Sequence, residues 1–122
     1  MRLQELAQSL ALKELTPALG VTDAESEGEA DITRGYASDL LSDVLAHAPV
    51  GGVLVTLQVH LNVIAVASHA GLRAVIFSCG RIPDDEIIER AAEEGLSLYA
   101  TPADTFDVVG RLHELGIRGS AA

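Results

Sequence analysis

Apolar segments that return at nearly constant spacing constrain the fold of this chain more than any other feature of its sequence. Three such segments start at Val53, Val75 and Leu98, which are 22 and 23 residues apart. That spacing accommodates one strand, one helix and two short loops. Since each connection holds a helix, successive strands are expected to be parallel, with right-handed crossovers. The sequence therefore predicts a three-layer α/β/α fold around a mainly parallel sheet of four to six strands.

The predicted strand and helix core runs from residue 31 to residue 116. Strands are expected at residues 32–36, 53–57, 74–78 and 96–100, and helices at about 39–48, 62–70, 84–94 and 104–115. Ser38 is expected to cap the first helix, with Asp39 near its N-terminus, and Asp104 to cap the fourth. The apolar residues expected to face the sheet are Leu40, Leu41, Val44, Leu45 and Ala48 in the first helix, Ile87, Ile88, Ala91 and Ala92 in the third, and Phe106, Val109, Leu112 and Leu115 in the fourth.

The two ends of the chain complete what is predicted to be one domain over residues 1–122. Leu3, Leu6 and Leu10 recur at helical spacing, so an amphipathic helix is expected first, followed by a short strand around residues 12–15. The acidic stretch at residues 23–31 is expected to be a solvated loop or hairpin. A divalent-cation loop is the alternative, although the stretch lacks the spacing that such loops need. Residues 117–122 are expected to form a tail.

Charge and cysteine content narrow the classes of partner and cofactor. Eighteen acidic and eight basic residues give a net charge of -10, which disfavours nucleic acid and anionic membranes as partners. A single cysteine, and no apolar run approaching the roughly 18 residues of a membrane-spanning helix, favour a cytoplasmic location. The chain has one lysine and no phosphate-binding loop, and His60, His69 and Cys79 match no zinc spacing. No cofactor, metal site or catalytic residue is therefore predicted.

Ligands of parallel sheets usually bind at the edge where the strands end, their carboxyl edge. A small anionic ligand is expected there, with Arg34 and Arg81 supplying positive charge and neighbouring glycines letting backbone N–H groups approach it. Ion pairs of these arginines with Asp39 and Asp84 are the alternative. The candidate ligand-binding residues are Arg34, Gly35, His60, Asn62, Cys79, Gly80, Arg81, Thr101 and Asp104.

Two of these candidates have a catalytic role as an alternative to ligand binding. His60 either orients a ligand or forms a hydrogen bond within a turn. Cys79 is either a thiolate activated by helix N–H groups and Arg81, or an inert thiol. A small uncharacterised enzyme that uses His60 or Cys79 is therefore the alternative to a binding module.

Four segments of the chain resemble the DRTGG domain family, which is related to the N-terminal domain of HPr kinase/phosphorylase. They are Gly35–Val44, Thr56–Ala67, Val75–Asp84 and Ala100–Phe106. This chain has His60-Leu61-Asn62 in place of the family's Asp-Arg pair and Ser78-Cys79-Gly80 in place of its Thr-Gly-Gly. In regulated pyrophosphatases the domain accompanies nucleotide-sensing modules of the cystathionine-synthase type and acts through subunit contacts.

The resemblance implies a non-catalytic regulatory or assembly module that senses a small anionic metabolite such as an adenine nucleotide. A homodimer is expected as well, because the predicted helix at residues 62–70 is apolar nearly all round and needs cover on more than one side. A different protein partner is the alternative.

Overall fold

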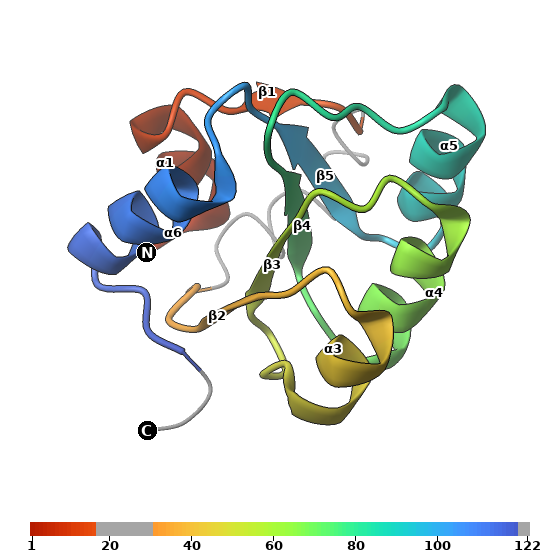
Figure 1. The fold of residues 1–122 in the computed structure, drawn as a ribbon, viewed down its shortest axis with the longest axis horizontal. Helices are drawn as coiled ribbons and strands as arrows, with labels where there is room; N and C mark the ends of the chain where they lie inside the picture. The colour runs from red at the N-terminus through yellow and green to blue at the C-terminus, as the bar shows by residue number, and fades with distance from the viewer. Residues whose placement is uncertain (17–30, 120–122) are drawn as a thin grey trace.

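The computed structural model describes residues 1–16 and 31–119, and its helices and strands alternate as the spacing predicts (Figure 1). The acidic stretch at residues 23–31 lies outside the described residues except for Asp31. The elements are α1 (Leu3–Ser9), β1 (Lys13–Glu14), β2 (Gly35–Ala37), α3 (Leu41–His47), β3 (Val53–Thr56), α4 (Leu61–His69), β4 (Ala74–Phe77), α5 (Asp85–Glu93), β5 (Ser97–Ala100) and α6 (Thr105–Glu114).

The strands form one sheet in the order β1-β5-β4-β3-β2. β2, β3, β4 and β5 run parallel, with Val55 paired to Ile76 and Ile76 to Tyr99, whereas the short β1 joins β5 antiparallel. Every residue of β3 and β4 is buried, as strands must be when helices cover both faces of a parallel sheet. The predicted α/β fold with a mainly parallel sheet is confirmed.

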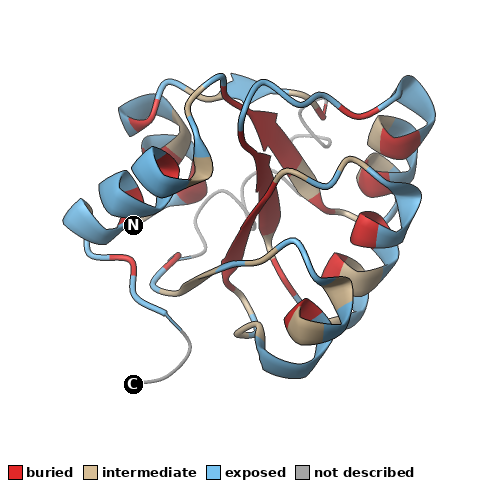
Figure 2. Ribbon diagram, in the orientation of Figure 1, coloured by how far each residue is buried: buried red, intermediate tan, exposed pale blue. Residues whose placement is uncertain are grey.

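Two helical layers enclose the sheet (Figures 1 and 2). α1 and α6 cover one face, where Val53 and Val55 pack in a cluster with Leu6 and Leu112. α3, α4 and α5 cover the other face, whose cluster includes Leu54. Side chains of one strand therefore alternate between the two clusters, as the two-residue period of a strand requires. The outer surfaces of the helices are exposed in Figure 2, while the central strands are buried.

α4 is covered mainly by its own chain. Val63, Ile64 and Ala67 are buried in this helix, and Val66 is half-buried against the same cluster. The helix lies between α3 and α5 on the sheet (Figure 1). Its apolar composition is thus explained within one chain, and the homodimer that was inferred from it stays a prediction.

The apolar faces predicted for two helices are partly wrong. Leu40 precedes α3 in an extended conformation and is 64% exposed, and Leu45 is 48% exposed, so α3 buries Val44 alone. In α6, Val108 and Leu112 are buried, while Phe106 is 87% exposed. At about 100° per residue, Phe106 lies on the far side of the helix from Val108. The three- and four-residue spacing was counted from Leu40 in one helix and from Phe106 in the other, and both starting residues are exposed.

Two predicted details near β2 are also wrong. The strand begins at Gly35 rather than at residue 32, and the side chain of Ser38 does not cap α3. Instead, the Asp39 carboxylate accepts hydrogen bonds from the Thr56 hydroxyl (2.8 Å) and the Leu57 amide (2.9 Å). Asp39 therefore ties the loop after β2 to the end of β3.

Candidate functional site

The connections after β3, β4 and β5 meet at the carboxyl edge of the sheet, because these strands are parallel and adjacent. This edge holds most of the predicted ligand-binding residues, namely His60, Asn62, Cys79, Gly80, Arg81, Thr101 and Asp104. Arg34 and Gly35 do not belong with them. Gly35 pairs with Val53, the first residue of β3, so both residues lie at the amino end of β2. The single site predicted to contain both arginines is therefore wrong.

The connection after β4 is a tight turn whose backbone groups are already used. Cys79 and Gly80 both have positive φ, +61° and +71°, and the Arg81 amide donates to the Ser78 carbonyl (3.2 Å). Two residues with positive φ are the pattern of a type I′ turn. The Cys79 amide donates to the Ala103 carbonyl (2.8 Å) and the Gly80 amide to the Thr101 carbonyl (3.0 Å). These amides are thus not available to an anion, contrary to the sequence-based expectation.

Several polar side chains at this edge stabilise the loops. The Ser78 and Thr105 hydroxyls are hydrogen-bonded at 2.6 Å, and the Thr101 hydroxyl accepts from the Ala103 amide (3.2 Å). Asp104 accepts from the Asp107 amide (2.8 Å), which confirms its predicted role as the cap of α6. Within residues 1–16 and 31–119, no buried side-chain nitrogen or oxygen lacks a hydrogen-bond partner.

His60 and Cys79 do not form a catalytic pair. His60 caps α4, because its Nδ1 accepts from the Asn62 amide (3.3 Å). The Cys79 thiol is exposed, and its hydrogen-bond partner among the described side chains is the Thr105 hydroxyl, at 3.9 Å. A nucleophile next to its base is the geometry that covalent catalysis requires. The described part of the chain also holds no group of three His, Cys, Asp or Glu side chains suited to a metal ion.

The predicted ion pairs of the two arginines are not formed among the described residues. The side-chain ion pairs there are Arg2 with Glu5, His47 with Asp43, and Arg90 with Glu94. Arg34 instead donates through Nη1 to the Gly119 carbonyl (3.1 Å). Arg81 is exposed and takes part in none of these pairs.

Each of four connections at the carboxyl edge carries an exposed apolar side chain, and these four residues are called the apolar row below. Leu40, Leu61, Ile82 and Phe106 are 64%, 41%, 53% and 87% exposed. They follow β2, β3, β4 and β5 respectively, which are neighbours in the sheet. Sequence reasoning missed this row because it assigned Leu40 and Phe106 to the core. The signal was present, since each of these four connections carries at least one large apolar residue at the start of a helix or shortly before it.

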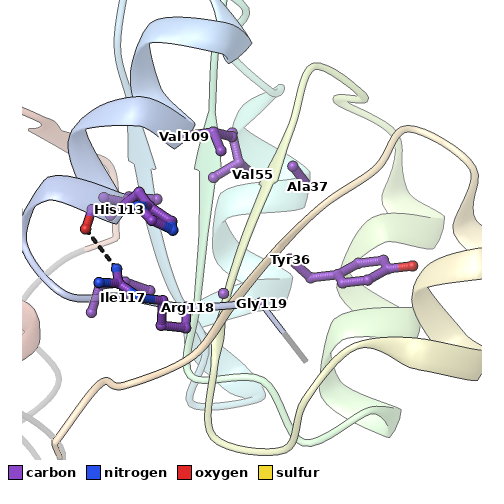
Figure 3. A pocket seen from close by; sticks show the side chains of 10 residues that line it. Tyr36, Ala37, Val55, Val109, His113, Ile117, Arg118 and Gly119 are labelled. Carbon is purple, nitrogen blue, oxygen red and sulfur yellow. Dashed lines mark hydrogen bonds between the residues drawn. The ribbon is translucent and has the colours of Figure 1, made fainter. Parts of the chain in front are cut away.

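A second candidate site is a cavity of about 350 Å³ between β2 and α6 (Figure 3). Its walls include Ala37 and Val55 from the sheet and Val109 from α6. The segment after α6 closes one side, where Arg118 Nη1 donates to the His113 carbonyl (2.7 Å). The lining residues are Gly35, Tyr36, Ala37, Val55, Val109, Leu112, His113, Ile117, Arg118 and Gly119.

Sequence reasoning treated residues 117–119 as a tail and so missed this cavity. Ile117 is buried, and Arg118 forms an isolated parallel bridge with Arg34. A Cβ atom on Gly35 would lie 3.2 Å from the Ile117 side chain, which is a tight contact. Gly35 therefore lets the returning segment pack closely against β2. An apolar residue directly after Gly116, the predicted helix stop, was the available signal.

Over the described residues, every helix is too short or too polar to cross a membrane. Comparison with known proteins then places the chain in context. Residues 21–115 match the DRTGG domain, and no match was found among curated proteins.

Among solved structures, the chain resembles the CBS and DRTGG domains of the regulatory region of Clostridium perfringens pyrophosphatase, complexed with the activator diadenosine tetraphosphate. The TM-score is 0.70 and the sequence identity is 16%, with 91% of this chain and 45% of the other covered. The chain thus spans less than half the length of that structure. At this identity the likeness shows a shared fold.

Proposed function

We propose that the chain, which belongs to the DRTGG domain family, is a non-catalytic regulatory or assembly module. In this proposal residues 1–122 form one domain of a cytoplasmic homodimer, related to the N-terminal domain of HPr kinase/phosphorylase. Two copies meet through the carboxyl edge of the sheet.

The observation that carries this proposal is the apolar row of Leu40, Leu61, Ile82 and Phe106. Scattered exposed apolar residues are normal on a protein surface, whereas one in each of four neighbouring connections at a single edge of the sheet favours an interaction site. Phe106 contributes most, because an aromatic ring buries a large area when it is covered. Covering this row with a second copy removes all four side chains from water.

The charges beside the row suit pairing between identical surfaces. Arg81 directly precedes Ile82, and Asp107 directly follows Phe106. In a two-fold arrangement each surface faces its own inverted copy, so Arg81 of one protomer can approach Asp107 of its partner. Opposite charges around an apolar centre fix the register of an interface more than they strengthen it.

Sedimentation of the purified chain at micromolar concentration tests the dimer. The expected mass is that of two copies, and Phe106→Ser is expected to weaken the dimer at least tenfold. Val50→Ser is the matched control, because Val50 is 84% exposed but lies before β3, at the opposite edge. A monomer for the unmodified chain, or equal weakening by both variants, contradicts a dimer through this edge.

The regulatory part of the proposal is that the carboxyl edge senses a small anion such as an adenine nucleotide, through Arg81 with His60 and Asn62. The exposure of Arg81, His60 and Asn62 at this edge supports it. The nucleotide activator in the C. perfringens pyrophosphatase structure also supports it.

Thermal unfolding with ATP present tests this part. At about 100 times its dissociation constant a ligand stabilises a fold by about 2.7 kcal/mol, which raises the melting temperature by several degrees in a domain of this size. Arg81→Ala is expected to abolish the shift, and Arg111→Ala, an exposed arginine within α6, to preserve it. If neither ATP nor diadenosine tetraphosphate shifts the melting temperature of the folded chain, the result contradicts nucleotide sensing, and only the assembly role is left.

An enzyme that uses His60 or Cys79 remains the alternative function. It requires turnover of a substrate that His60→Ala or Cys79→Ala abolishes. The hydrogen bonds of both side chains favour the binding module, because His60 caps a helix and, within the described part of the chain, Cys79 contacts a threonine hydroxyl instead of a base.

A further inference from the structure

The space between β2 and α6 arises from small side chains on one face of an edge strand. Gly35 and Ala37 line this space, whereas the side chain of the intervening Tyr36 points to the opposite face, toward α3 (Figure 3). α6 packs through Val108 and Leu112 against the cluster on this side of the sheet. No bulky side chain of β2 fills the remaining space, which leaves the cavity of about 350 Å³.

The inner part of this cavity is apolar. Ala37, Val55 and Val109 lie together in Figure 3, and Leu112 contributes a further apolar side chain. Val109 is 38% exposed, although neighbouring Val108 is buried. An apolar group placed there would gain contacts that residues 1–16 and 31–119 leave unmade.

The other end of the cavity is basic. His113 and Arg118 line it, and Arg34 donates to the carbonyl of Gly119, a lining residue. None of the lining residues is Asp or Glu, although the chain has 18 acidic residues. Arg118 is held by its hydrogen bond to the His113 carbonyl, which leaves further N–H donors of its guanidinium for an anion.

We propose that this cavity binds a small amphipathic anion, an apolar body that carries one phosphate or carboxylate group. The apolar body contacts Val55 and Val109, and the anionic group pairs with Arg118 and His113. Guanidinium groups recognise both anions through paired hydrogen bonds. The volume lies at the small end of the range of ligand pockets, about 300–1,000 Å³, which suits one aromatic ring or a short acyl chain. This site is separate from the carboxyl edge and goes beyond the function proposed above.

Amide shifts in ¹⁵N-labelled protein, titrated with phenyl phosphate, test the proposal. Saturable shifts are expected at Ala37, Val109, His113 and Gly119. Benzoate is expected to shift the same amides, whereas inorganic phosphate and benzyl alcohol, which each supply one half of the ligand, are expected to bind at least tenfold more weakly.

Two variants and two matched controls locate the site. Arg118→Gln removes the charge, and Ala37→Leu fills the cavity from an exposed strand position; each is expected to weaken phenyl phosphate binding at least tenfold. Arg111→Gln and Ala46→Leu change equivalent exposed residues of α6 and α3 outside the cavity, and are expected to leave binding unchanged.

Shifts confined to Asn62, Gly80 and Arg81 would overturn the cavity proposal while supporting an anion at the carboxyl edge. Equal binding by Arg118→Gln and the unmodified chain, or no saturable shift at all, would also overturn it. The dimer is measured separately by its mass, so failure of one proposal does not imply failure of the other.

Discussion

Tyr36 contacts the apolar core with its ring and a carboxylate with its hydroxyl. Its ring packs against the cluster beneath α3, α4 and α5, while its hydroxyl donates to both carboxylate oxygens of Asp43, at 2.8 and 2.9 Å. This hydrogen bond is the main cause that lowers the pKa of Asp43 and raises the pKa of Tyr36. His47 approaches the same carboxylate at 3.0 Å and lowers the pKa of Asp43 further.

The Tyr36 to Asp43 contact makes stability depend on pH in a defined direction. Because folding lowers the pKa of Asp43, the contact contributes fully above the unfolded value of about 3.8 and is lost as pH falls through the folded value. Tyr36→Phe is therefore expected to lower the melting temperature at pH 7 and to change it progressively less as the pH is taken below 4. Thermal unfolding between pH 7 and pH 2 measures this.

Tyr99→Phe is the control for that experiment. Burial, with a smaller effect of Glu14, raises the pKa of Tyr99 to about 12. The phenol of Tyr99 thus stays neutral throughout the acid range, and its contribution is complete below about pH 10 and lost as pH rises through 12. An acid-dependent difference of the same size in Tyr99→Phe would contradict the role assigned to Asp43.

α6 illustrates what local sequence determines and what it does not. Its limits follow from Asp104 as the cap and Gly116 at φ +95°, both of which are visible in the sequence. Its buried face depends on which residues meet the sheet, and no local pattern specifies that. Gly110 lies within the helix, and a Cβ atom added to it would meet nothing within 4 Å.

Glycine in an open helical position costs stability, so Gly110→Ala is expected to stabilise the fold by about 0.5–1 kcal/mol. Gly116→Ala is expected to destabilise it by about 1 kcal/mol, because alanine is strained at positive φ even where space is open. Urea unfolding of both variants measures the difference. Changes of the same sign would contradict the backbone roles of these two glycines.

The contrast between local sequence signals and tertiary contacts explains which elements and site residues could be predicted. β3, β4 and β5 form continuous apolar blocks with Gly or Pro nearby, and the connections after them therefore appear where expected. β2 has three residues and starts three residues later than predicted, so Arg34 lies before the strand instead of within it. The bridge between Arg34 and Arg118 joins residues far apart in sequence, which periodicity cannot detect.

The sheet lies between two core clusters, which we expect to unfold as one cooperative unit. Leu6 is fully buried on the α1 side and Ile64 is 1% exposed on the α4 side. Substitution of either by Ala is expected to cost about 2–5 kcal/mol, because each leaves a cavity in packed surroundings. Leu45→Ala, at a half-exposed position, is expected to cost clearly less.

The chain's two tyrosines report on opposite sides of the sheet, since Tyr99 belongs to the cluster with Leu6 and Tyr36 packs against the cluster with Ile64. Urea unfolding followed by tyrosine fluorescence of Tyr36→Phe and of Tyr99→Phe is expected to coincide with the circular dichroism transition of each variant. Separate transitions would show that the two layers unfold independently.

Each end of the described chain pairs with the part of the core that is farther from it in sequence. Lys13 and Glu14 pair with Ala100 and Tyr99, while Arg34 pairs with Arg118. During synthesis on the ribosome, β1 can therefore join the sheet only after β5 has emerged, and β2, which pairs with β3 earlier, gains the Arg34 bridge only after the segment after α6 has emerged. The border at β1 can form only once β5 has been made, and the Arg34 bridge only once Arg118 has been made, so the nascent chain cannot complete this sheet in the order of its sequence and exposes unpaired strand edges in the meantime.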